Sequence, residues 1–244
     1  MKWVTLLLTL LMAPQVWAQT NYSNWRFGTE YYQYVEPAVM TEETRLPTLI
    51  VNYRRDAGAN SAAIGLPITL DAEFGYGLTQ YTGTGDMNTS FTRLKFEGVY
   101  LFDTGLFLGL GYRTLTDHLG YKLSSTGAAG YDRLSQYYYA PIGFVSETDG
   151  NRWQIQYNYF LRGTQTSYFT QISGYGNDVR NTQKRGFGID LSYAPASAGW
   201  ELFWRYWSLE DSDMQLLYSA GGDPLSFALE PKNTTSELGI RFSF

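Results

Sequence analysis

Apolar and polar residues alternate along most of the chain. In residues 68–78, every second residue from Ile68 to Leu78 is apolar, and those between them are polar or glycine. Side chains point to opposite faces of a β-strand in turn, so this alternation predicts a strand with one apolar face. The alternation recurs, less cleanly in the last three, in residues 93–102, 106–113, 153–162, 186–193, 200–207, 237–244, 23–35, 48–55 and 134–145. The pattern predicts about ten strands of the length that a tilted membrane strand needs.

The expected connections are alternately short and long. Short ones fall at residues 103–105, 146–151 and 195–199, and long ones at 36–47, 80–90, 115–132, 163–184 and 208–233. The segment 57–67 breaks this order, because it is too long for a turn. We therefore predict an all-β, closed antiparallel up-and-down barrel of about ten strands. Eight strands remain an alternative, as do twelve if segments 168–172 and 214–218 extend the sheet or add a hairpin.

Residues 1–18 have the features of a secretory signal peptide. Lys2 precedes an apolar core at residues 4–12, and residues 16–18 (VWA) give the small-residue pattern that a signal peptidase cleaves. This core is too short to span a bilayer. We expect the mature protein to be one domain at residues 19–244.

Composition narrows the class of protein. The chain has no cysteine, 18 Lys and Arg, 23 Asp and Glu, and a net charge of −5. Thiol chemistry is therefore excluded, and without a basic run we expect no nucleic-acid partner. The mature chain has no apolar run near the length of a transmembrane helix, so it can cross a membrane only as a closed barrel, in which every strand backbone group is paired.

Aromatic residues make up 17% of the chain, which is typical of a membrane barrel with aromatic girdles at both interfaces. In the expected register, the strand ends beside the short turns carry Trp25, Phe102, Trp153, Tyr193, Trp200 and Phe244, and the opposite ends carry Tyr76, Tyr112, Tyr159 and Tyr206. The alternative, a soluble β-sandwich, would turn the apolar faces inward and gives these girdles no role.

The chain ends in a strand whose alternate residues are Leu238, Ile240, Phe242 and Phe244. This segment resembles the last strand of bacterial outer-membrane β-barrel proteins, which the insertion machinery reads as alternating apolar residues ending in an aromatic. The resemblance covers the mature chain as an architecture and implies an integral, porin-like protein of the outer membrane. It also implies the barrel-insertion machinery, outer-membrane lipid and lipopolysaccharide as partners, and it leaves the surface ligand open.

The polar faces of the expected strands are rich in charge. Directed into the lumen are Arg26, Glu30, Arg54, Asp71, Glu73, Arg93, Lys95, Glu97, Arg113, Arg162, Asp190, Glu201, Arg205, Glu237 and Arg241, eight positive and seven negative. Because an unpaired buried charge is expensive, this near-balance favours a lumen plugged by ion pairs over a conducting pore. Inward glycines such as Gly188 and Gly239 ease curvature or leave room for inward Phe107, Phe160, Phe203 and Trp207.

His118 is the only histidine, and it follows Asp117. Ten-stranded barrels include the omptin proteases, and that resemblance would imply acids and an Asp–His pair at the rim, here Asp117, His118, Asp211 and Asp213. The spacing and order differ from that family, and adjacent strand residues point to opposite faces, so we expect a solvated histidine and no catalytic residue. Glu210, Asp211 and Asp213 also suit a divalent cation, but a solvated acidic loop is the preferred interpretation, with no metal or cofactor.

Three functional hypotheses follow. The first is a non-enzymatic surface protein whose loops serve recognition or whose barrel supports the envelope. The second is a narrow channel for small solutes. The third is an omptin-like hydrolase at the barrel rim.

Overall fold

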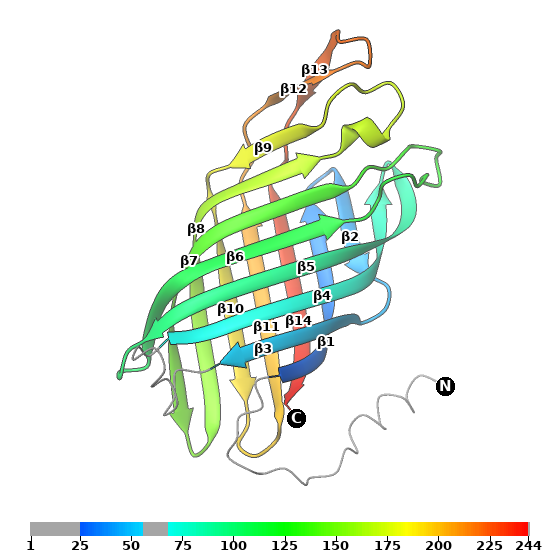
Figure 1. Cartoon of the computed structure of the whole chain (residues 1–244). Coiled ribbons are helices and arrows are strands. Elements are labelled where there is room, and N and C mark those ends of the chain that lie inside the picture. The colour runs from blue at the N-terminus through cyan, green and yellow to red at the C-terminus, as the bar shows by residue number, and fades with distance from the viewer. Residues whose placement is uncertain (1–24, 56–67, 244) are drawn as a thin grey trace, which may run out of the picture.

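The computed structural model describes residues 25–55 and 68–243 as a closed antiparallel barrel (Figure 1). The wall has ten strands. Two of these strands are interrupted, one into β2 and β3 and the other into β9 and β10. The wall consists of β1 (Trp25–Glu36), β2 (Met40–Thr44), β3 (Thr48–Arg55), β4 (Ile68–Gly83), β5 (Gly85–Leu101), β6 (Leu106–Asp117), β7 (Arg133–Thr148), β8 (Asn151–Ser167), β9 (Val179–Gln183), β10 (Gly186–Ala194), β11 (Trp200–Leu209) and β14 (Asn233–Ser243). Pairing of β1 with β14 closes the barrel. The predicted fold class and strand number are confirmed.

The barrel has the inverted polarity of a membrane protein. Large apolar side chains cover its outer wall, with Leu110 70% exposed and Trp153 58% exposed. Arginine and glutamate side chains fill the interior, where Arg93 and Glu237 are completely buried. A soluble β-sandwich would show the opposite distribution, so that alternative is wrong. No helix in the described part of the chain is long and apolar enough to cross a membrane.

The short turns lie together at the lower end in Figure 1. They connect β5 to β6, β7 to β8 and β10 to β11. The β7–β8 turn is a two-residue hairpin in which Asp149 (φ 52°) and Gly150 (φ 75°) are both left-handed. This conformation gives the twist that antiparallel strands need, and an Asp-Gly pair favours it. The predicted short connections are confirmed.

Two of the predicted long connections are wrong. Residues 36–47 and 80–90 are largely strand, because β1 is separated from β2 by three residues and β4 from β5 by Thr84 alone. Above the apolar band, outward positions such as Gln80 and Thr82 are polar as well as exposed. The sequence there looks like a loop, although backbone pairing extends the strands beyond the apolar band.

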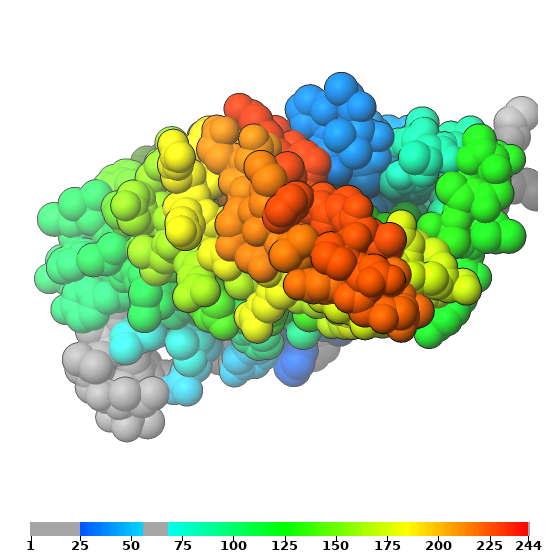
Figure 2. All heavy atoms as spheres, turned by 90° about the horizontal axis from the view of Figure 1, so that it is seen from above, coloured from blue at the N-terminus to red at the C-terminus, as the bar shows by residue number. Residues whose placement is uncertain are grey.

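Two connections at the opposite end are long, as predicted, and a third carries a hairpin. Residues 118–132 and 168–178 connect wall strands, the latter through the 3-10 turn η2 (Phe169–Gln171). Residues 210–232 include the hairpin of β12 (Gln215–Tyr218) and β13 (Pro224–Ala228). Seen from above, this hairpin lies across the upper end of the barrel, and no opening into the barrel is visible (Figure 2). Residues 214–218 thus add a hairpin outside the wall, whereas 168–172 adds no strand.

The expected signal peptide (1–18), the segment 57–67 and the terminal Phe244 lie outside the described residues.

Candidate functional site: the barrel interior

Glu73 is the centre of an ion-pair network inside the barrel. It projects inward from β4, and its carboxylate lies 2.6 Å from Arg205, 2.8 Å from Arg93 and 3.1 Å from Arg241. The side chains of Glu73 and Arg93 are completely buried. Space for Arg93 comes from Gly75, where a Cβ atom would stand 3.2 Å from the guanidinium. On the inward face of β4, Glu73 therefore supplies the carboxylate and Gly75 leaves the space for the Arg93 side chain.

Glu237 of β14 extends the network across the barrel. Its carboxylate contacts Arg113 at 2.7 Å, Arg93 at 2.8 Å and Arg205 at 3.1 Å. Glu30 of β1 pairs with Arg93 at 2.6 Å. Because each carboxylate here is shared by or paired with buried guanidinium groups, positive and negative charge are closely matched in the middle of the lumen.

A second part of the network lies nearer the short turns. Arg26 contacts Glu201 at 2.7 Å, Asp71 at 3.0 Å and the Asn52 amide oxygen at 2.7 Å. Arg241 joins this group to the centre, since it also lies 3.2 Å from Glu201.

Lys95 of β5 forms a further group of ion pairs in the lumen. Its amino group lies 2.9 Å from Glu97 and 3.6 Å from Asp190. Gln156 donates a hydrogen bond to Glu97 at 2.8 Å, and Asn158 donates one to Asp190 at 3.2 Å. Polar side chains therefore complete the partners of these two carboxylates.

The structure contradicts one predicted lumen residue. Arg162 is exposed on the outer face. Tyr138 pairs with Arg162 and Tyr139 with Phe160, so Leu161 is the extra residue of a β-bulge. A bulge adds one residue to one strand and reverses the alternation beyond it. The other fourteen predicted lumen residues face the interior: Arg26, Glu30, Asp71, Glu73, Arg93, Lys95, Glu97, Arg113, Asp190, Glu201, Arg205, Glu237, Arg241 and, lining the cavity at the short-turn end, Arg54.

Glycines provide the space for the large inward rings. A Cβ atom on Gly188 would lie 2.9 Å from the Trp207 ring, and one on Gly239 would lie 2.5 Å from the Phe203 ring. Both distances are below normal carbon–carbon contact. The expectation that these glycines leave room for Trp207 and Phe203 is confirmed.

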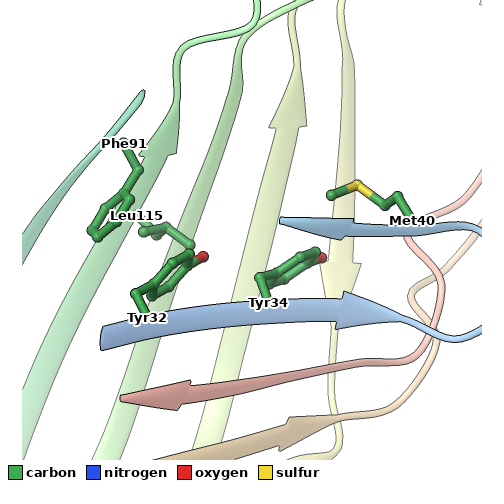
Figure 3. Packing of buried hydrophobic residues seen from close by; sticks show 5 residues of the cluster. All are labelled: Tyr32, Tyr34, Met40, Phe91 and Leu115. Carbon is green, nitrogen blue, oxygen red and sulfur yellow. The ribbon is translucent and has the colours of Figure 1, made fainter. Parts of the chain in front are cut away.

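A buried layer of side chains lies between the central network and the end of the barrel opposite the short turns. Tyr32, Tyr34, Met40, Phe91 and Leu115 form this layer, and the Tyr32 and Phe91 rings lie 4.2 Å apart between centroids (Figure 3). Tyr32, Phe91 and Leu115 occupy the inward positions next to the network residues Glu30, Arg93 and Arg113 on the same strands. Buried side chains therefore fill the lumen at this level.

The sequence analysis missed an acidic group at the level of this layer, where Glu36 pairs with Met40 and Glu42 with Tyr34. Glu36, Glu42, Asp117 and Glu230 are buried there with Arg133, which contacts Glu36 at 2.5 Å and Asp117 at 3.0 Å. The first two were missed because they fall in the segment expected to be a loop. No apolar alternation in the segment 36–47 indicated that the strands continue there.

Glu230 ties the hairpin loop to the interior. Its carboxyl group accepts a hydrogen bond from the Tyr34 hydroxyl at 2.6 Å, and it also accepts bonds from the Gln165 and Asn233 amides. Burial, with a smaller contribution from the charge of Glu36, raises the pKa of Glu230 to about 8. The neutral form of the carboxyl group is therefore the form that the folded protein favours near neutral pH.

A cavity opens at the short-turn end of the lumen. It contains about 670 Å³ of empty space, including its open mouth, and its lining includes Arg54, Lys95, Glu97 and Gln154. Its inner limit is formed by network residues such as Arg205. Among the described residues, the cavity therefore forms a vestibule, which ends at the ion-paired side chains of the central network.

The rim does not bring together the residues of the hydrolase hypothesis. Asp117 turns into the barrel toward Arg133, whereas the His118 imidazole lies 3.2 Å from the Thr92 hydroxyl. Asp213 accepts hydrogen bonds from the backbone of Thr182 and from Gln215. Within residues 25–55 and 68–243, no group of three or more His, Cys, Asp or Glu side chains is arranged to hold a metal ion.

Closure, inverted polarity and a charge-filled interior define the chain as a β-barrel of the bacterial outer-membrane type. No protein-family model matches the sequence, and no curated protein matches it. Among solved structures, the β domain of the Bordetella autotransporter BrkA is similar at 16% identity, over 92% of this chain and 100% of that chain, with a TM-score of 0.45. The outer membrane protease OmpT from Escherichia coli is similar at 11% identity, over 95% and 100%, with a TM-score of 0.40. An outer membrane channel from Pseudomonas putida F1 is similar at 12% identity, over 93% and 100%, with a TM-score of 0.42. The class rests on the barrel's own geometry.

Proposed function

We propose that this chain is a non-enzymatic, non-conducting barrel of the bacterial outer membrane that presents its loops for recognition at the cell surface. It reaches the membrane with the N-terminal signal peptide and inserts through its last strand. The observation that supports the proposal is the filling of the lumen by side chains. Ion-paired side chains fill its centre, and a buried aromatic and aliphatic layer lies above them.

The loops support the recognition role. On the β12–β13 hairpin, Leu216 pairs directly with Phe227, and both are exposed together with Leu225. The opposite face of β12 turns Leu217 into the protein. Grouped apolar side chains on a polar surface are typical of an interaction site. A rigid barrel that carries such a loop is a suitable scaffold for binding.

Planar-bilayer conductance of the refolded protein tests the proposal. We expect no unitary openings from the wild-type protein, with a known porin as the positive control. A variant that lacks residues 214–228 should also stay closed, because the seal lies in the lumen below the hairpin. Reproducible openings of the wild type would refute the proposal and favour a narrow channel for small solutes. The vestibule beside Lys95 and Glu97 is the observation that supports this second candidate.

A further inference from the structure

Four exposed basic residues gather on one part of the outer wall. They are Arg162 on β8, Arg180 on β9, and Lys184 with Arg185 between β9 and β10. Gly163 pairs with Gln183, and this register places Arg162 beside Lys184, which directly follows β9. None of the four has a carboxylate within ion-pair distance among the described residues. Like charges placed side by side on a sheet repel each other, so this arrangement costs stability unless an anion binds there.

The cluster depends on local departures from regular strand structure. The bulge at Leu161 turns Arg162 outward, away from the lumen to which simple alternation would direct it. The break between β9 and β10 falls at Lys184 and Arg185. Regular pairing across both sites would have buried one of the charges or separated them.

The cluster lies at the upper boundary of the apolar band. Along β8 the exposed outward residues up to this point are Trp153, Ile155, Tyr157, Tyr159 and Leu161, and Arg162 comes next. On the neighbouring strand β10, Phe187 lies two residues after Arg185, and its outward ring stacks on the ring of Tyr157. Aromatic girdles mark the membrane interfaces, so the basic residues stand at the depth of lipid headgroups.

A shallow groove joins the two neighbouring cations. Leu161, Arg162, Thr182, Lys184 and Asp213 line it. It offers an apolar side chain at the membrane side and two cations beyond it. Asp213 is the one acid present, and its carboxylate is already engaged by the Thr182 amide and the Gln215 side chain. The groove therefore suits a molecule that has an acyl chain and an adjoining phosphate.

We propose that Arg162 and Lys184, assisted by Arg180 and Arg185, bind the phosphate of a phosphorylated glycolipid in the outer leaflet, as in lipid A. Guanidinium and ammonium groups are the usual partners of phosphate in proteins. The site rests on the proposed outer-membrane location, but it is independent of whether the lumen conducts. A conducting barrel with this lipid site would refute only the proposed function.

The test is a titration of the folded full-length protein, in neutral detergent, with bisphosphorylated lipid A, read by native mass spectrometry. Each basic residue near a charged surface contributes about 1 kcal/mol, about fivefold in affinity. The double variant Arg162→Gln/Lys184→Gln should therefore bind about 30-fold more weakly than wild type. The matched control is Arg45→Gln, which removes an exposed arginine across the barrel, and it should change affinity less than twofold.

Other outcomes overturn the proposal. They are equal binding of lipid A whose phosphates have been removed, full displacement by millimolar inorganic phosphate, or unchanged affinity in the double variant. Asp213→Asn should bind more tightly, because it removes a neighbouring negative charge, and weaker binding would contradict direct phosphate contact. If gel mobility shows that the double variant does not fold, the single variants Arg162→Gln and Lys184→Gln take its place, each with about a fivefold loss expected.

Discussion

Replacing Glu73 by Gln is the sharpest perturbation of the barrel interior. The change keeps the size of the side chain and removes one negative charge. Glu73 is shared by Arg93 at 2.8 Å, Arg205 at 2.6 Å and Arg241 at 3.1 Å, so three buried guanidinium groups lose a common partner. The amide of the glutamine can accept only part of these hydrogen bonds and brings two donors of its own.

The expected cost follows from burial. Removing one partner of a buried ion pair costs about 3–5 kcal/mol, because the remaining charge stays buried. With a urea dependence of about 1–3 kcal/mol per molar, a loss of 3 kcal/mol lowers the unfolding midpoint by about 1–3 M. The double variant Glu73→Gln/Arg205→Gln should lose less than the sum of its two single variants, since it also removes one unpaired cation.

The assay is urea unfolding of the barrel in lipid vesicles, followed by the different gel mobility of folded and unfolded protein. The matched control is Glu43→Gln, which changes an exposed carboxylate that accepts a hydrogen bond from Tyr31 on the outer face. Its effect should stay within about 0.5 kcal/mol. If Glu73→Gln cost no more than Glu43→Gln, the carboxylate would be solvated, and the argument for a closed interior would be refuted.

Three further predictions concern other parts of the barrel. The raised pKa of Glu230, about 8, means that the neutral carboxyl stabilises the loop and that this stability is lost as pH rises through about 8. The protection of the loop amides against hydrogen exchange, corrected for the intrinsic rise of amide exchange with pH, should fall over that range, and Glu230→Gln should abolish this fall. Gly111→Ala places a Cβ atom 2.2 Å from the Tyr139 ring and should cost about 1–3 kcal/mol in urea unfolding. The control Gly98→Ala meets only Leu70, at 3.5 Å, and should be nearly neutral. Leu110→Arg puts a charge on the lipid face and should destabilise the barrel in vesicles by about 2–4 kcal/mol, and an effect near zero would mean that this face is not in lipid.

The alternation of apolar and polar residues determined most of the architecture. A side chain one residue further along a strand faces the other side, so the pattern at 68–78 separates an apolar face from a polar one, and the aromatic girdles identify the apolar face as the lipid face. Short polar connections such as Asp149-Gly150 show where the chain reverses, because local backbone conformation is enough to make a tight turn. Fold class and the inward position of Glu73 were therefore accessible without any coordinates.

Tertiary structure decided features that depend on more than one strand. The bulge beside Arg162 exists because two strands pair with unequal numbers of residues, and this reversed the predicted direction of a charge. The buried acids Glu36 and Glu42 lie in strands that persist above the membrane through pairing with polar neighbours, for which the sequence has no apolar signal. The ion pairs that cross the lumen, such as Arg93 with Glu237 and Arg205 with Glu73, were likewise undetermined, since they join strands that come close only when the barrel closes. The sequence by itself determined the two faces of each strand, because alternation is a local property. Register, bulges and ion pairs were determined by closure of the barrel, which depends on strands far apart in the sequence.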